Sequence, residues 1–225
     1  MGKDKYAIIL AGGSGTRMGG AVPKQFIRVD RKTLLQRSIE RFVEAEPGIR
    51  IVTVLPKAHF VTWKRLCAEE SFECPQLLVE GGMNRFLSVR NALAKVPDGA
   101  LVAIHDGVRP FVGVELIREM FSRMDGCRAL IPVLPVSDTL RSTDASVPDP
   151  DRSRTVAVQT PQVFASEDIK RAYAQPYNPT FTDDASVASR LGTVVEMIPG
   201  EKFNIKVTTP EDLVFAEAIL SRQRP

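Results

Sequence analysis

The sequence is poor in cysteine and has no long apolar run, and each absence excludes a class of protein. Its 225 residues include three cysteines, an odd number, and their wide spacing matches no zinc site. We expect free thiols and a reducing, cytoplasmic location. No stretch is apolar for long enough to span a membrane, and the first residues lack the apolar region of a signal peptide. We therefore expect no membrane partner. The cysteines are Cys67, Cys74 and Cys127.

A strong excess of charge of one sign is also absent. The formal net charge is +3, and basic and acidic residues are interspersed. This balance is too mild to indicate a nucleic-acid partner. The hydrophobic fraction of 44% is ordinary for a soluble globular enzyme. A small anionic substrate remains compatible with the sequence, because it needs only local positive charge.

Apolar runs alternate with segments of helical period through most of the chain. The first run, Tyr6–Leu10, has the continuous apolar character of a buried parallel strand, and Leu35, Ile39 and Phe42 then recur at helical spacing. This alternation predicts one α/β domain over residues 1–225, with a doubly wound, mainly parallel Rossmann-like sheet and helices on both faces. Further strands are expected at 49–55, 77–79, 101–105, 129–133, 194–198 and 203–207, and further helices at 57–70, 86–96, 114–124, 165–174, 183–191 and after Pro210.

The alternation stops at about 135–160. Two short extended runs, Val136–Thr139 and Thr155–Val158, flank a polar stretch rich in Pro, Asp, Ser and Arg. A surface loop would account for the polar stretch alone. The β-forming residues on both sides favour a projecting β-arm instead.

A glycine-rich loop follows the first strand, and it lacks the marks of the two commonest phosphate-binding loops. Gly13 and Gly15 fit the dinucleotide pattern G-x-G-x-x-G, but the third glycine is replaced by Met18. No Gly-Lys-Ser/Thr occurs in the chain, which excludes a P-loop. Glycines let backbone N–H groups approach phosphate oxygens, and Arg17 and Lys24 can neutralise their charge. The loop therefore predicts a nucleoside triphosphate site, in preference to a plain turn with two solvated cations.

A second group of candidates follows the strand at 101–105. Asp106 can hold Mg²⁺ bridged to phosphates, and Arg109 can bind a phosphate by paired hydrogen bonds. The alternative is an ion pair between these two that ties down the loop. We interpret His105 as a structural side chain at the strand end. Lys206 interrupts an apolar segment, so it faces either solvent or a site.

A third group follows the strand at 77–79, where Gly81 and Gly82 precede a helix that begins near Asn84, Arg85 and Ser88. Small residues beside a helix start can admit a nucleobase or a phosphate. They can equally form an ordinary turn between strand and helix.

Several segments occur in an order shared with a known family. The chain contains Ala-Gly-Gly-Ser-Gly-Thr-Arg-Met, Pro-Lys-Gln, Gly-Gly…Arg…Ser-Val, His-Asp-Gly-Val-Arg-Pro, Val-Ser-Asp-Thr, Gln-Thr-Pro-Gln, Phe-Thr-Asp-Asp-Ala-Ser and Asn-Ile-Lys-Val-Thr-Thr-Pro-Glu-Asp-Leu. The first two are common to many nucleotidyltransferases, whereas the ordered set is much more specific. It covers nearly the whole chain and resembles the 2-C-methyl-D-erythritol 4-phosphate cytidylyltransferases of the non-mevalonate isoprenoid pathway.

The resemblance implies that the methylerythritol phosphate attacks the α-phosphorus of CTP and that pyrophosphate leaves. It implies stabilisation of the transition state by Arg17 and Lys24. Four further roles follow for the remaining positions. The nucleotide would contact Leu10, Ala11, Gly12, Gly13, Gly82 and Ser88; the second substrate would contact Asp106, Arg109, Thr139, Thr160 and Thr182; Mg²⁺ would be held by Asp106; and the attacking phosphate would be positioned by Arg152 and Lys206.

The resemblance also implies a homodimer, since the arm of this family crosses to a partner subunit and completes its site. On that alignment Thr139 and Arg152 lie on the arm, and Arg154 is a rival for the place of Arg152. Met83 stands where relatives often carry a polar or acidic residue, so a side-chain contact to the ribose is not expected there.

Two other functions remain open from the residues alone. A ribitol 5-phosphate cytidylyltransferase would share the loop and the Arg-Pro-Phe ending at Arg109–Phe111. A nucleotide-binding regulatory module would bind CTP without turnover. The presence of Arg17, Lys24, Asp106 and Lys206 together favours an enzyme.

Overall fold

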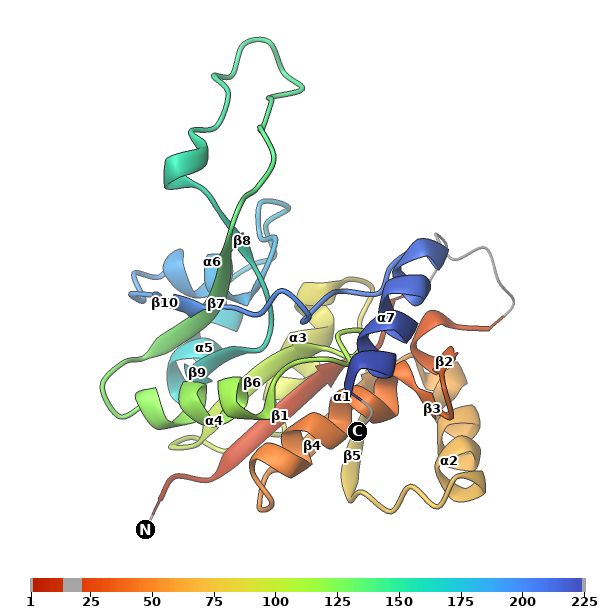
Figure 1. Cartoon of the computed structure of the whole chain (residues 1–225). Helices are drawn as coiled ribbons and strands as arrows, with labels where there is room; N and C mark the ends of the chain where they lie inside the picture. The colour runs from red at the N-terminus through yellow and green to blue at the C-terminus, as the bar shows by residue number, and fades with distance from the viewer. Residues whose placement is uncertain (1, 14–21, 224–225) are drawn as a thin grey trace.

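The structure is a computed structural model that describes residues 2–13 and 22–223. Across this part of the chain a large mixed sheet forms the centre of the molecule (Figure 1). Its strands lie in the order β10 (Glu196–Pro199), β7 (Ala129–Pro135), β9 (Gln162–Ala165), β6 (Leu101–Asp106), β1 (Lys5–Leu10), β4 (Arg50–Leu55) and β5 (Gln76–Glu80), and β8 (Val156–Val158) pairs with β7.

Most neighbours in this sheet run parallel. The pairs β1–β4, β1–β6, β4–β5 and β7–β10 are parallel, whereas β9 is antiparallel to both β6 and β7. The predicted mainly parallel α/β fold is thereby confirmed. The antiparallel strand β9 was not predicted.

Helices cover both faces of the sheet, because successive side chains of a strand point to opposite sides. On β1, Ala7 and Ile9 join one buried core, while Tyr6 and Ile8 join the other. The first core is covered by α1 (Leu34–Ala45), α2 (Phe60–Glu69) and α4 (Val114–Arg123), and the second by α3 (Arg85–Leu93), α5 (Ser166–Tyr173) and α6 (Asp184–Ser189).

A third, smaller core lies between the C-terminal helix and the loop that follows β6. Helix α7 (Pro210–Gln223) places Ala216 and Ile219 against Val108 and Phe111, which follow β6. The same cluster includes Val29 of a small hairpin that the sequence did not predict, formed by β2 (Arg28–Val29) and β3 (Lys32–Thr33).

The predicted arm is present in the structure. Strands β7 and β8 pair antiparallel from Val133–Val158 to Pro135–Val156, and the chain between them projects from the body of the molecule (Figure 1). A short 3-10 helix, η4 (Arg152–Arg154), lies on the returning segment of the arm just before β8, and nearly all side chains of the arm are exposed (Figure 1).

The strand predicted at 203–207 is wrong. This segment is irregular, and most of its polar groups bond to residues outside any sheet ladder. Asn204 donates from its side chain to Thr160 O, and its own carbonyl accepts from Arg109. The apolar–polar alternation does not follow burial here, because the polar residue Asn204 is buried together with Val207 whereas the apolar residue Phe203 is exposed.

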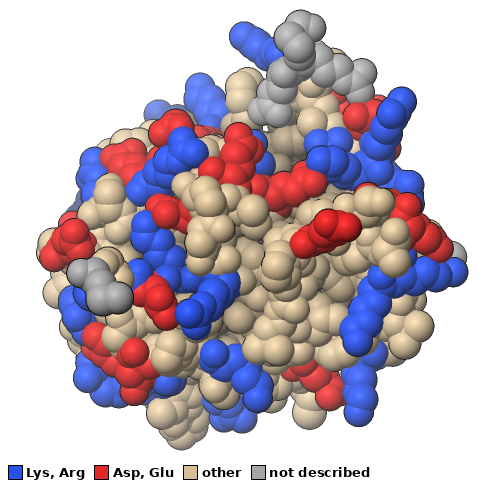
Figure 2. Space-filling view, turned by 90° about the horizontal axis from the view of Figure 1, so that it is seen from below, with Lys and Arg blue, Asp and Glu red and all other residues tan. Residues whose placement is uncertain are grey.

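Two surface properties bear on partners. Within the described residues, none of the helices combines the length and the apolar character needed to cross a bilayer. The face of the molecule in Figure 2 carries basic and acidic side chains interspersed around a broad uncharged area.

Candidate active site

A cavity of about 450 Å³ opens where the carboxyl ends of β1, β5 and β6 meet. This is the edge at which parallel sheets bind their ligands. Most of the predicted site residues line it: Leu10, Ala11, Gly12, Gly13, Lys24, Gly82, Ser88, Asp106 and Lys206. Gln25, Met83, Asn84, Arg85 and Val108 also line it and were not among the predicted site residues.

One side of the cavity is made of backbone and small side chains. Ser88 accepts a hydrogen bond from the N–H of Gly82 at 3.0 Å and donates to Asn84 O at 2.9 Å, which fixes the turn between β5 and α3. A Cβ atom on Gly82 would collide with Leu87, so only glycine fits this turn. Asn84 caps the helix by accepting from the N–H of Leu87 at 2.9 Å. This side of the cavity therefore presents backbone and small side chains held in one turn.

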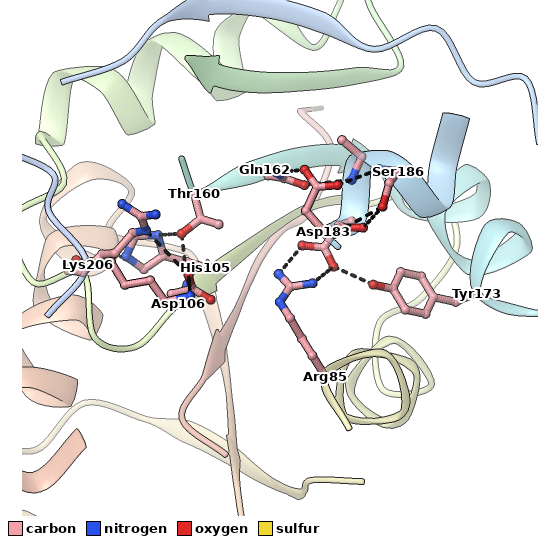
Figure 3. A network of polar contacts seen from close by, with 12 residues as sticks. Arg85, His105, Asp106, Thr160, Gln162, Tyr173, Asp183, Ser186 and Lys206 are labelled. Atoms are coloured by element: carbon pink, nitrogen blue, oxygen red, sulfur yellow. Dashed lines mark hydrogen bonds and ion pairs between the residues drawn. The ribbon is translucent and has the colours of Figure 1, made fainter. Parts of the chain in front are cut away.

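The opposite side is a carboxylate surrounded by cations. The Asp106 carboxylate lies 2.9 Å from Nζ of Lys206 and 3.6 Å from Nε of Arg109 (Figure 3). Burial alone would raise the pKa of this carboxyl, but the charges of Lys206 and Arg85 outweigh burial and hold the pKa well below its ordinary value. Asp106 is therefore ionised at neutral pH.

A further cation, Arg85, reaches the cavity from the first turn of α3. Its guanidinium forms a bidentate ion pair with Asp184, at 2.8 and 2.6 Å, and the Tyr173 hydroxyl donates to Asp184 at 2.6 Å (Figure 3). Asp184 has no exposed surface. Burial opposes the charged form of Arg85, but the Asp184 carboxylate outweighs it and raises the guanidinium pKa. The sequence marked Arg85 only as a helix start, since its partner lies 99 residues away.

Behind Asp106 a chain of hydrogen bonds holds the turn that carries it. His105 is fully buried, and burial lowers its pKa to about 4, so its ring is neutral at pH 7. The carbonyl of Arg109 can only accept, so Nε2 of His105 donates to it (3.0 Å) and Nδ1 accepts from the Thr160 hydroxyl (3.1 Å). Thr160 in turn accepts from the N–H of Asp106 (3.1 Å).

The remaining predicted residues lie away from the described part of the cavity. Thr160 is buried and Arg109 lies behind Asp106, whereas Thr182 is exposed just before α6. Thr139 and Arg152 are exposed on the arm, where Arg152 donates to Ser137 O at 3.0 Å. Arg17 lies outside the described residues.

The described residues offer one carboxylate for Mg²⁺ and no complete set of protein ligands. The described residues contain no group of three or more His, Cys, Asp or Glu side chains placed to hold a metal. Asp106 offers one ionised carboxylate at the cavity wall. Mg²⁺ is commonly held by one or two carboxylates together with substrate phosphates and water. The residues present therefore fit a magnesium ion that arrives with a phosphorylated ligand.

Fold and cavity together place the chain among the α/β nucleotidyltransferases, with glycine-rich backbone facing a cluster of cations across the edge of the sheet. Comparison with known proteins narrows the class. The family profile described as "IspD: 2-C-methyl-D-erythritol 4-phosphate cytidylyltransferase" matches residues 6–222. The chain belongs to this family.

Individual relatives agree with the family match along nearly their whole length. The 2-C-methyl-D-erythritol 4-phosphate cytidylyltransferase of Bacteroides thetaiotaomicron is 45% identical over 214 residues, which cover 95% of this chain and 98% of that protein. That of Porphyromonas gingivalis is 45% identical over 224 residues, covering 98% and 100%. The crystal structure of 4-diphosphocytidyl-2C-methyl-D-erythritol synthase from Anaerococcus prevotii superposes with a TM-score of 0.82 at 30% identity, covering 98% of this chain and 97% of that one.

Proposed function

We propose that this chain transfers CMP from CTP to 2-C-methyl-D-erythritol 4-phosphate, giving 4-diphosphocytidyl-2-C-methyl-D-erythritol and pyrophosphate in isoprenoid biosynthesis. The observation that carries the proposal is the two-sided cavity. Its glycine wall at Gly12, Gly13 and Gly82 faces the charged group of Asp106 and Lys206. One side suits a nucleotide, and the other suits a phosphorylated alcohol.

The chemistry requires no nucleophile from the protein. A phosphate oxygen of the second substrate forms a bond to the α-phosphorus of CTP, the bond from that phosphorus to the bridging oxygen breaks, and pyrophosphate departs with the electron pair. Catalysis then consists of positioning and of neutralising charge that develops on the phosphorus oxygens. We assign that neutralisation to Lys24, which lines the cavity, and to Arg17.

The opposite side would hold the attacking substrate. Lys206 places a cation at the cavity wall for its phosphate, and Asp106 can accept from a substrate hydroxyl. Arg109, Thr160 and Thr182 were also assigned to this substrate, and only through the resemblance. Asp106 would hold the Mg²⁺ ion, which when bound supplies positive charge to the phosphates of CTP.

The arm is proposed to act in a second copy of the chain. Thr139 and Arg152 (or Arg154) are exposed on the arm, and contact with a partner's cavity would bring them to a substrate phosphate. A homodimer joined through residues of about 135–160 is therefore part of the proposal. So are a single domain over 1–225 and a cytoplasmic location, the latter supported by three free thiols.

The test is release of pyrophosphate from CTP–Mg²⁺ with either methylerythritol 4-phosphate or ribitol 5-phosphate. We expect faster turnover of methylerythritol 4-phosphate. Faster turnover of ribitol 5-phosphate would overturn the substrate assignment. Binding of CTP with no turnover of either alcohol would favour the regulatory module.

A further inference from the structure

The chain leaves the arm through two buried residues, Gln159 and Thr160, that contact both segments carrying the charged side of the cavity. They follow β8 directly, and each is 6% exposed. One of these segments is the turn Asp106–Arg109 after β6. The other is the irregular stretch 201–206, which ends at Lys206. The base of the arm thus bonds to two segments that lie far apart in the sequence.

The Thr160 hydroxyl holds the first segment. It accepts from the N–H of Asp106 and contacts His105, whose other ring nitrogen reaches the carbonyl of Arg109 (Figure 3). One hydroxyl thereby reaches both ends of the turn. A shift of this hydroxyl would displace the backbone from which the Asp106 carboxylate extends.

Gln159 and Asn204 hold the second segment. The Gln159 side chain donates to Glu201 O at 2.9 Å and accepts from the N–H of Glu201 at 3.1 Å. Asn204 donates to Thr160 O at 2.8 Å, and its carbonyl accepts from Arg109 Nη1 at 2.8 Å. These bonds tie residues 201–204 to the arm base, two residues before Lys206.

A glycine preserves the fit. A Cβ atom on Gly200 would lie 2.6 Å from Oε1 of Gln159 and 3.2 Å from Val133 O. A side chain at residue 200 would therefore displace the Gln159 amide from its bonds to Glu201. Because Val133 belongs to β7, the other strand of the arm, both strands take part in the junction.

We propose that Thr160, with Gln159 and Asn204, forms a positioning junction that sets the distance between Asp106 and Lys206. Because the Thr160 hydroxyl is already engaged by the N–H of Asp106 and by His105, we assign it this positioning role in place of the substrate contact that the resemblance implies. This inference rests on the proposed function, since the segments it holds are those assigned to the attacking alcohol phosphate. Among the described residues, Thr160, Gln159 and Asn204 make no hydrogen bond to Gly12, Gly13 or Gly82, so we expect the junction to affect the alcohol phosphate and not the nucleotide.

The test compares Thr160→Val, which keeps the shape of the side chain and removes its hydroxyl, with Thr160→Ser, which keeps the hydroxyl. We expect Thr160→Val to lower kcat/KM for methylerythritol 4-phosphate by about 10- to 100-fold, as displacement of a positioned group does. The dissociation constant for CTP, measured by calorimetry without Mg²⁺, should stay at the wild-type value. Thr160→Ser should restore most of the activity.

Three results separate the alternatives. If wild-type protein turns over no methylerythritol 4-phosphate, the proposed function fails and the comparison is void. If wild type is active and Thr160→Val loses thermal stability but keeps wild-type kcat and KM, the junction is merely structural and the inference is overturned. Equal losses of CTP affinity and of kcat/KM would also overturn it.

A second variant covers the case in which Thr160→Val does not fold. Gln159→Ala removes the bonds to Glu201 without placing a new polar atom in the junction. We expect a raised KM for methylerythritol 4-phosphate with unchanged CTP affinity. A wild-type KM in a folded Gln159→Ala protein would contradict the junction.

Discussion

The wall of the cavity and the projecting arm are stabilised in opposite ways. At the wall, charged groups are buried or partly buried and their partners come from distant parts of the chain, as with the partly exposed Arg85 and the fully buried Asp184. On the arm, side chains are exposed and their bonds join near neighbours, such as Asp151 with Ser153 and Asp144 with Ser146. Buried groups that are paired on all sides can hold one geometry, whereas exposed local bonds are exchanged readily for water.

The difference indicates which part of the site one chain can position by its own fold. The junction at Thr160 and the pair Arg85–Asp184 fix the cavity from within. On the arm, the exposed Arg152 side chain makes a single hydrogen bond among the described residues, to Ser137 O, so a fixed position for its guanidinium would come from a surface outside its own chain. That is the physical argument for placing the arm residues in a partner's site.

Removal of the Lys24 ammonium group from the cavity wall should give the largest effect on activity. We expect Lys24→Ala to lower turnover by about 10²- to 10³-fold, equivalent to about 2.7–4 kcal/mol, because one contact to the developing charge is lost. Lys57→Ala, at an exposed lysine of the 3-10 helix η3 (Lys57–His59), is the matched control and should leave turnover unchanged. Steady-state release of pyrophosphate measures both. Near-normal activity of Lys24→Ala would contradict the role of Lys24 in neutralising the developing charge.

The ion pair at the wall should matter for stability. Asp184→Asn should lower the free energy of unfolding by about 3 kcal/mol, because it leaves the Arg85 charge without its buried partner. Urea denaturation followed by circular dichroism gives the value. A decrease in the free energy of unfolding no larger than that for an exposed ion pair would show that the Arg85–Asp184 pair does not stabilise the wall.

Acid should lower the free energy of unfolding through protonation of His105. Its folded-state pKa of about 4 lies below the ordinary value, so the unfolded chain binds a proton first as pH falls. The contribution of His105 to stability is fully present above about pH 6.5 and is lost between there and about pH 4, by at most about 3.4 kcal/mol at 1.36 kcal/mol for each pKa unit. Urea midpoints across this range measure the slope. Between about pH 6.5 and 5, above the range where carboxyls such as Glu167 begin to contribute, the slope should be lost in His105→Gln and persist in His59→Asn; its persistence in both variants would assign it elsewhere.

The arm should give the smallest effect on stability. Arg141 pairs with Asp149 at 2.6 Å, but the Arg141 side chain is 80% exposed. We expect Arg141→Ala to change the free energy of unfolding by less than about 1 kcal/mol, as exposed ion pairs do. The same urea titration applies. A loss as large as that of Asp184→Asn would erase the distinction between arm and wall.

The sequence predicted the sheet and most of the wall, and missed what depends on distant partners. Continuous apolar runs such as Tyr6–Leu10 identify buried parallel strands without further context. Strand β9 is short and contains Gln162, a polar residue whose complete burial depends on bonds to Asp183 and the N–H of Ala185. No local pattern reveals such bonds.

The two errors at the site have the same physical origin. Apolar and polar residues alternate over 203–207 as in a strand, yet Asn204 donates to Thr160 O and its carbonyl accepts from Arg109. Arg85 was noted only as a helix start, because its carboxylate partner lies far away in the chain. The glycines and cations of the loop, by contrast, predict a phosphate site from residue type alone.

The most direct test of the division between wall and arm is a complementation experiment with two inactive variants. Lys24→Ala damages the wall of its own cavity, and Arg152→Ala damages the arm. If the arm serves a partner's cavity, a mixed dimer contains one site with an intact Lys24 and an intact Arg152. After co-refolding, we predict that the mixture regains pyrophosphate release that neither variant shows alone. A mixture that exchanges subunits, demonstrated by mass spectrometry, and stays inactive would contradict the account.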